Sequence, residues 1–446
     1  CFEFMIDSVD TIMFDWLLDD VLLSIGKWKL ILAPTFGGLL VGIFTYFIAR
    51  DARGAGVAPV LAAVETNAGR MNPWAILTKP IATALTVGSG GSGGKEGPVI
   101  QIGAAIGSTT ARMLRLSDEN VKLMLASGAA GGIAATFNAP IAGVFFALEV
   151  ILRRFNTRNF SVVVLASVVA TTTSVLIRGD DPTLSIQPHE LENVIFEIPL
   201  YAILGGVAGV ISIAFMRSLY WTEDRFLQLP VHPLLLPAIG GVLVGTIGLY
   251  NRDILGLGET ALEEALSGEG MVRILLLVLV LKIAATSLTI GSGGSGGVFG
   301  PSLFIGAMLG GAFGGLVNEL FPDQTATSGA YATVGMAALT AGTARSPITA
   351  VMIIFELTRD YEIILPVMTA VVTATLVSQL LSRDTIFTYG LSRRGVVIEE
   401  EGMPSDVMQS LLVSDAMTPA AARVAPETPI GEIAIELAGD RETIAL

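Results

Sequence analysis

The glycine-rich segment 88–108, GSGGSGGKEGPVIQIGAAIGS, contains one carboxylate in otherwise apolar surroundings. This residue, Glu96, stands between Lys95 and Gly97-Pro98. An ionised side chain among apolar membrane segments costs free energy, so its presence indicates a function. At a helix start, an ionised Glu96 can occupy the backbone N–H donors that an anion would use, and protonation would release it. The segment therefore predicts a gate that could also carry protons. Alternatively, Glu96 only complements its own helix dipole.

The same glycine-rich pattern occurs again 203 positions later, in segment 291–311, as GSGGSGGVFGPSLFIGAMLGG. Thirteen of the first twenty aligned positions are identical, but Lys95-Glu96 is replaced by Val298-Phe299. Paired interrupted segments in corresponding halves of a membrane protein indicate a transport site.

Pro98 and Pro301 suit the first turns of the helices that follow the two glycine-rich segments. A helix start carries unpaired N–H donors and about half a unit of positive charge. Two such starts facing one point would bind a small anion without a full countercharge, which permits release as well as binding. The alternative is that the glycines only allow helices to pack closely.

Two further blocks repeat at nearly the same spacing. The segment that ends at Glu149 aligns with the one that ends at Glu356 at an offset of 207, and segment 54–56 aligns with 256–258 at 202. Three blocks with similar offsets indicate a duplicated unit of about 200 residues. We expect the two matching glutamates to hydrogen-bond backbone groups at helix–loop junctions rather than to relay protons.

The composition indicates a membrane protein. Mean hydropathy is +0.69, and 15% of the 446 residues are charged. Several apolar stretches approach the length needed to cross about 30 Å of hydrocarbon, which makes a large soluble helical domain the weaker alternative. The net charge of −14 argues against nucleic-acid binding. The long apolar stretches are Leu30–Ala49, Val162–Leu176, Ile198–Ala214, Leu234–Leu249 and Ile274–Thr289.

The sequence offers little for enzymatic or metal chemistry. The single cysteine, Cys1, excludes a multi-cysteine metal site, and His189 and His232 both lie near prolines in expected loops. A phosphate-binding loop is excluded because Ser89 stands where its first glycine should be and Glu96 follows the lysine. We therefore expect no catalytic residue, no metal and no cofactor, and a membrane enzyme that uses Glu96 is a poor alternative.

The segments 94–98 (GKEGP) and 297–301 (GVFGP) closely resemble those of the CLC family of chloride channels and proton-coupled chloride antiporters. Segment 54–57 resembles the first filter loop of that family, and segment 386–394 resembles its last, pore-lining helix. The resemblance covers roughly Leu30 to Gly395. It implies an all-α polytopic membrane protein with an inverted-repeat fold and many tilted, broken helices. It also implies a homodimer with one anion pathway per subunit.

The resemblance also implies the site. Glu96 falls on the external gating glutamate of the family, and backbone groups of the filter loops would bind chloride. The residues expected at the anion are Lys95, Glu96, Gly97, Val298, Phe299, Gly300, Ala55, Gly56 and Phe387.

Three departures from the family pattern bear on mechanism. Ala55 stands where the family usually has a serine, with Ala58 in place of a proline, and Phe387 stands where a tyrosine usually contacts the anion. Each missing hydroxyl should weaken binding by about 1 kcal/mol. Tyr389 could compensate only with a different alignment. Val150 occupies the position of an internal proton-accepting glutamate in many antiporters.

These departures favour uncoupled, channel-like chloride conduction gated by Glu96. The alternative is a chloride/proton antiporter with Glu96 as its external proton-carrying gate, because some family antiporters lack the internal acid. A remote alternative is a non-transporting membrane receptor. The expected partners are small anions, the lipid bilayer and a second copy of the chain.

The sequence predicts four regions: a cytoplasmic or interfacial segment 1–29, transmembrane repeats 30–220 and 221–395, and a cytoplasmic tail 396–446. Within the tail, segment 413–430 resembles the start of a CBS domain, which when complete often binds adenine nucleotides. A disordered acidic tail is the alternative.

Arginine pairs flank apolar segments at 153–154 and 393–394, and we expect both on the cytoplasmic side. The expected location is the plasma (inner) membrane of a prokaryote.

Overall fold

The chain divides into two units by its internal contacts, Cys1–Ile398 and Glu399–Leu446. The CBS-like start expected at 413–430 lies in the second unit and, apart from position 429, outside the described residues. The structure is a computed structural model, which describes residues 2–14, 28–179, 194–322, 324–393 and 395–396, together with position 429.

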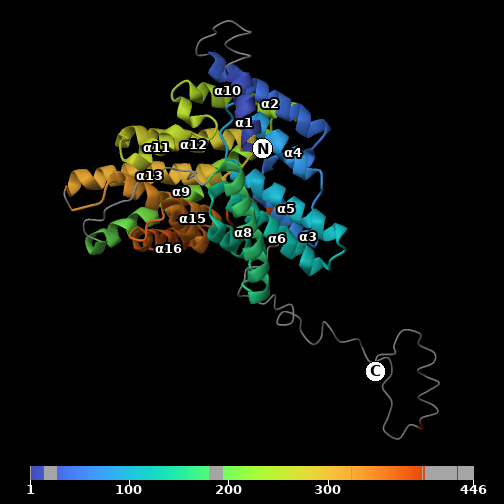
Figure 1. Cartoon of the computed structure of the whole chain (residues 1–446). Helices are drawn as coiled ribbons and strands as arrows, with labels where there is room; N and C mark the ends of the chain where they lie inside the picture. The colour runs from blue at the N-terminus through green and yellow to red at the C-terminus, as the bar shows by residue number, and fades with distance from the viewer. Residues whose placement is uncertain are drawn as a thin grey trace. The chain divides into compact units, whose positions relative to one another are not determined.

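The first unit is built mainly from helices (Figure 1). Its N-terminal half contains, in order, α1 (Phe2–Asp10), α2 (Lys29–Phe47), η3 (Arg50–Ala52), β1 (Gly54–Ala55), α3 (Val57–Thr66), α4 (Ala75–Val87), α5 (Glu96–Met113), α6 (Asp118–Phe137), α7 (Pro140–Phe146), η4 (Ala147–Leu152) and α8 (Thr157–Arg178).

A long helix, α9 (Val194–Leu227), leads into the C-terminal half of the unit. The elements that follow are α10 (Leu236–Gly248), η5 (Arg252–Ile254), α11 (Glu259–Ser267), α12 (Val272–Gly291), β2 (Ser295–Gly296), α13 (Phe299–Leu320), α14 (Ser328–Ala344), α15 (Pro347–Thr358), α16 (Ile364–Leu381) and α17 (Tyr389–Ser392).

Six helices of the described residues are long and apolar enough to cross a membrane. The expected apolar stretch Leu234–Leu249 is one of the shorter helices, α10, with 13 residues. Broken helices are tolerated inside a membrane where other protein segments cover their ends. The six long helices are Lys29–Phe47, Asn159–Arg178, Phe196–Leu227, Val272–Gly291, Phe299–Leu320 and Ile364–Leu381.

The two halves break their helices at equivalent places. Asn138 ends α6 with φ 54°, and Arg345 ends α14 with φ 52°, both in the left-handed conformation that closes helices. Pro140 and Pro347 then open α7 and α15 at their first turns. The sequence repeat is therefore also a repeat of helix boundaries.

The boundary expected between residues 220 and 221 lies inside α9. An offset of 207 pairs α8 with α16, and the same offset brings α2 onto α10. The boundary between the two repeats therefore stays a prediction, because α9 runs through it without a break.

Corresponding helices form matching hairpins in the two halves. Helix α5 packs along α6, and α13 packs along α14. In Figure 1, α3 to α6 lie on one side of the unit, while α11 and α13 lie on the other. Helices α2 and α10 join the halves, and their contact is reciprocal. A β-carbon on Gly38 would overlap the Pro237 carbonyl, and one on Gly241 would overlap that of Pro34. Glycines permit this close approach.

Candidate functional site

The two glycine-rich segments meet in the interior of the first unit. The Gly94 N–H donates to the Gly297 carbonyl at 2.8 Å, and the Gly297 N–H donates back to Gly94 at 2.7 Å. Beside this bridge, β1 (Gly54–Ala55) pairs in parallel with β2 (Ser295–Gly296). The loops that the sequence identified as repeats are therefore joined by their backbones.

Three of these loops approach so closely that side chains would not fit between them. A β-carbon on Gly56 would overlap the Gly97 carbonyl, and one on Gly97 would lie 3.0 Å from the Gly297 α-carbon. Glycine is thus required at these positions because backbone meets backbone. The contact brings the first filter loop to the starts of the helices that follow both glycine-rich segments.

Glu96 lies between the two helix starts. It is the first residue of α5, and 6% of its surface is exposed. Its Oε2 atom accepts a hydrogen bond from the N–H of Gly300, in the first turn of α13, at 3.1 Å. Gly94 also lies against this carboxylate oxygen. The carboxylate therefore uses one of the N–H donors that the sequence assigned to an anion.

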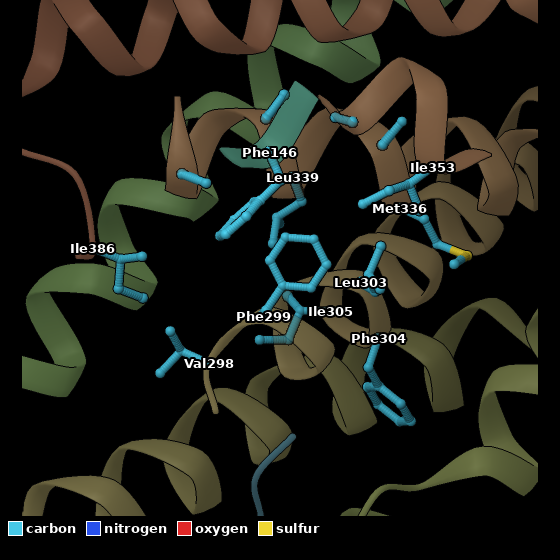
Figure 2. Packing of buried hydrophobic residues seen from close by; sticks show 14 of the residues in the cluster. Phe146, Val298, Phe299, Leu303, Phe304, Ile305, Met336, Leu339, Ile353 and Ile386 are labelled. Carbon is cyan, nitrogen blue, oxygen red and sulfur yellow. The ribbon is translucent and has the colours of Figure 1, made fainter. Parts of the chain in front are cut away.

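The equivalent position in the second copy is apolar. Figure 2 shows the Phe299 ring enclosed by the side chains of Phe146, Leu303, Ile305 and Leu339. The ring centroids of Phe299 and Phe146 lie 6.2 Å apart. Low polarity around the Val298–Gly300 backbone strengthens the interaction of its N–H groups with a negative charge.

The Lys95 side chain is paired with acidic groups. Its Nζ lies 2.6 Å from Glu3 of α1 and 3.5 Å from Glu259, the first residue of α11. Glu3 also pairs with Arg178 at the end of α8. The ammonium charge next to Glu96 is thus largely balanced. Segment 1–29, expected to be cytoplasmic or interfacial, contributes α1 to this cluster, and α1 also packs against α4.

Two buried lysines that the sequence analysis missed hold the filter loops. Lys79 on α4 donates to the carbonyls of Ala52 and Gly54 at 3.0 and 2.7 Å. Lys282 on α12, 203 positions later, donates to three carbonyls, those of Ile254, Gly256 and Leu257, at 3.1 to 3.3 Å. Both side chains are fully buried. A lysine within an apolar helix is itself a signal of function, and their matched spacing could have identified the pair.

The last expected contributor, Phe387, is 2% exposed. Its neighbour Ile386 donates its N–H to the Thr343 carbonyl at 3.1 Å, which anchors this segment on α14. The Tyr389 ring packs instead on Tyr220 of α9, with centroids 4.8 Å apart. Tyr389 is therefore occupied in a contact with α9. Phe387 and Ala55 carry no hydroxyl, and the Phe387 N–H already donates to the Thr385 hydroxyl at 3.2 Å.

A cavity of about 760 Å³ opens beside the first filter loop. It is lined by Gly54 and Ala55 and by the charged side chains Arg50, Asp51, Arg53, Arg70, Glu223, Asp224 and Arg393. We call this side the inner side, because it carries Arg393 of the arginine pair expected in the cytoplasm. Water in this cavity can reach the loop that contains Ala55.

The matching glutamates bridge the two halves reciprocally. Glu149 accepts hydrogen bonds from the N–H groups of Ile348 and Thr349 at 3.1 and 2.9 Å, at the start of α15. Glu356 accepts from Ile141 and Ala142 at 2.8 and 2.7 Å, at the start of α7. The prediction that they bind backbone is confirmed. Reciprocal contacts of this kind require a two-fold relation between the copies.

Val150, which follows Glu149, is 4% exposed and lies in the π-helical turn η4. The equivalent part of the second copy remains in the α-helix α15. An apolar side chain at this position cannot exchange a proton. Among the described residues, no group of three or more His, Cys, Asp or Glu side chains could hold a metal.

Two helix starts that meet around a carboxylate, inside a bundle of apolar helices, define a multi-pass membrane protein that transports anions. Residues 37–379 match the voltage gated chloride channel family, and the chain belongs to this family, known as CLC. The family comprises chloride channels and transporters rather than enzymes.

Similar proteins include both named channels and exchangers. Chloride channel protein CLC-f of Arabidopsis thaliana is 35% identical over 374 residues, which are 77% of this chain but 46% of the plant protein. The H(+)/Cl(-) exchange transporter ClcA of Vibrio parahaemolyticus is 30% identical over 406 residues, 88% of this chain and 85% of ClcA.

Among solved structures, a slow cyanobacterial Cl-/H+ antiporter is similar with a TM-score of 0.79 and 26% identity, and the match covers 88% of this chain and 93% of that one. A eukaryotic CLC transporter, with a TM-score of 0.72 at 22% identity, shares the fold. The expected fold, a mostly helical membrane protein with many short, tilted helices, is confirmed.

Proposed function

We propose that the protein exchanges chloride for protons across the membrane, with Glu96 as the group that closes the pathway and carries the proton. The observation that carries this proposal is the hydrogen bond from the Gly300 N–H to Glu96 Oε2. A carboxylate and a chloride ion compete for this donor because both are anions. The named exchangers among the relatives, ClcA and the cyanobacterial antiporter, support coupling.

Competition and protonation together produce exchange. The ionised carboxylate is attracted by the N–H groups and partial positive charges at the starts of α5 and α13, so it excludes chloride. A proton that binds the carboxylate removes its charge and with it most of this attraction. Chloride can then accept the Gly300 N–H, while the neutral side chain leaves with its proton. Helix starts hold chloride without a fixed full charge, so it can also depart.

Uncoupled conduction, favoured by the sequence alone, is the second candidate. Val150 is its supporting observation, because a proton acceptor is missing at a position where many antiporters have one. The missing hydroxyls at Ala55 and Phe387 also favour conduction. They weaken chloride binding, so chloride competes less strongly with Glu96 for the backbone donors. The named relatives include a chloride channel protein as well as exchangers.

The reversal potential distinguishes the two candidates. Purified protein in liposomes is placed under opposing chloride and pH gradients, and the voltage of zero net flux is measured. Exchange predicts a reversal potential that shifts with the pH gradient at fixed chloride. A potential set by chloride alone would overturn exchange and establish conduction. Glu96→Gln is the matched control, because it keeps the size of the side chain and cannot release a proton.

We further propose a homodimer with one pathway in each subunit, in the plasma membrane of a prokaryote. The exposed apolar side chains of α8 and α16, such as Leu165, Val169, Met368 and Leu376, would face lipid or the second subunit. A complete CBS domain that begins near residue 413 would bind an adenine nucleotide. Cross-linking in liposomes tests the dimer, and calorimetry with ATP on a protein that contains the complete domain tests the nucleotide.

A further inference from the structure

We propose that the Arg53 guanidinium forms a recruitment site for small monovalent anions at the inner mouth, from which chloride passes to the backbone donors near Ala55. The inference rests on the proposed movement of chloride through these loops and holds for exchange and for conduction. It concerns a side chain that the sequence repeat does not preserve, because the aligned position in the second copy is Leu255.

Arg53 is positioned by the second glycine-rich segment. It directly precedes β1, whose Gly54 N–H donates to the Gly294 carbonyl at 3.0 Å. The Arg53 Nη2 donates to the neighbouring Ser292 carbonyl at 3.3 Å, and the guanidinium lies against the α-carbon of Gly293. A side chain on Gly293 would occupy the same space. The charge is therefore held across both repeats, two residues from Ala55.

The guanidinium has donors left for an anion. It carries five N–H donors, of which the Ser292 carbonyl engages one. Arg53 and Ala55 both line the cavity of about 760 Å³, so an anion in the cavity can reach both. A charge-assisted hydrogen bond from arginine is stronger than one from a hydroxyl. Arg53 thus supplies attraction in a pathway that lacks the hydroxyls at Ala55 and Phe387.

The other charges of the cavity are arranged differently. Arg393 is paired with Asp224 at 2.5 Å, and Arg70 is paired with Asp118 at 2.8 Å. Glu223 interacts electrostatically with Arg53. This carboxylate limits how tightly Arg53 can hold an anion, and transport requires release as well as capture.

The test measures chloride flux as a function of chloride concentration on each side in turn, in liposomes whose protein orientation is read with a C-terminal tag. We expect Arg53→Gln to raise the half-saturating chloride concentration on the inner side about fivefold to tenfold and to leave the outer value within about twofold. Arg53→Lys keeps a point charge without the planar fork of the guanidinium. Its half-saturating chloride concentration on the inner side should therefore lie between those of the parent protein and Arg53→Gln. Arg50→Gln, at an exposed arginine of the same cavity, is the matched control, expected within about twofold of the parent.

A second variant tests the proposed balance. Glu223→Gln removes the opposing charge and should lower the inner half-saturating concentration about twofold to threefold, with slower release at high chloride. The proposal is overturned if a folded Arg53→Gln protein keeps the parent's half-saturating chloride concentration on the inner side. It is also overturned if this concentration rises equally on both sides. If Arg53→Gln does not fold, an inner value for Arg53→Lys equal to the parent overturns it.

These outcomes are separate from the test of exchange. The dependence of the reversal potential on pH should be the same in Arg53→Gln as in the parent protein, because Arg53 is not on the proton-carrying group. A parent protein whose reversal potential ignores pH overturns exchange and leaves the inner-side chloride shift to decide the role of Arg53.

Discussion

The inner filter loop, Arg53–Gly56, and its repeat, Leu255–Gly258, have the same backbone support but different side chains. Lys79 holds the carbonyls of the first loop, and Lys282 holds those of the second. Duplication thus preserved the way in which each loop is held. It did not preserve the charge that each loop presents.

The two loops have the same backbone support but different surroundings, so the two ends of the pathway differ in charge. The inner loop borders a cavity of about 760 Å³ and carries Arg53. The second loop is followed by Glu259, which, together with Glu3, pairs with Lys95 next to the gate. We infer that the repeated backbone makes the anion site and that unrepeated side chains give the pathway its direction.

The largest expected effect comes from the residue that differs most between the copies. Glu96→Gln should remove the pH dependence of chloride flux while flux continues, because the neutral amide no longer competes as an anion. In the parent protein, flux should rise as the pH on the Glu96 side falls, since protonation frees the site. Flux measured across a pH series checks this. A variant that keeps the pH dependence of the parent would show that another group is the gate.

The shared support predicts a loss of stability in each half, somewhat larger for Lys282, which holds three carbonyls, than for Lys79, which holds two. Lys79→Met and Lys282→Met each leave buried carbonyls without their donor, which should cost about 2–3 kcal/mol of unfolding free energy. Thermal unfolding in detergent measures both, with Arg273→Met, an exposed position on α12, as the control. If only one of the two substitutions destabilised the protein, the two loops would be held differently despite their corresponding lysines.

The reciprocal caps predict a smaller paired effect. Glu149→Ala and Glu356→Ala each remove a carboxylate from the start of a helix in the other half, at a cost of about 1–2 kcal/mol. Thermal unfolding again provides the measurement, and Glu263→Ala on the exposed face of α11 should change little. A loss confined to one of the two variants would contradict the two-fold relation inferred from their contacts.

The smallest expected effect concerns the Lys95 cluster. Glu3→Gln leaves the Lys95 charge less balanced, so chloride on the gate side should bind about twofold more tightly. Half-saturation measured from that side, at low and high ionic strength, checks the change, and a charge effect should shrink at high salt. Glu119→Gln, distant from Lys95 in the exposed start of α6, serves as control. An effect that ignores ionic strength would assign Glu3 a packing role instead.

Much of the site could be predicted because its segments occur twice in the sequence, once in each repeat. The two glycine-rich segments and the pair Glu149/Glu356 were recognised by their spacing, and the structure gives the two glutamates matching contacts. Lys79 and Lys282 also repeat at the same offset, but each is a single charge inside an apolar helix, and only the fold shows which carbonyls it holds.

The balance of charges could not be read from the sequence. Lys95 was expected among the residues at the anion, but its partners Glu3 and Glu259 lie 92 and 164 positions away along the chain. Nothing near Arg53 in sequence indicates that the Ser292 carbonyl would hold it. The preference for conduction was based on missing polar groups: the hydroxyls at Ala55 and Phe387 and a carboxylate at Val150. The named exchangers among the relatives favour coupling instead.

The sequence by itself determined the membrane-protein class, the duplication and the family, and it singled out Glu96 as the proposed gate, because hydropathy, repetition and glycine-rich helix starts are local properties of the chain. The tertiary structure alone decided what each charge does. The interaction of a carboxylate, an ammonium or a guanidinium depends on distance and on the surrounding polarity, and folding sets both by bringing together residues such as Glu96 and Gly300, 204 positions apart.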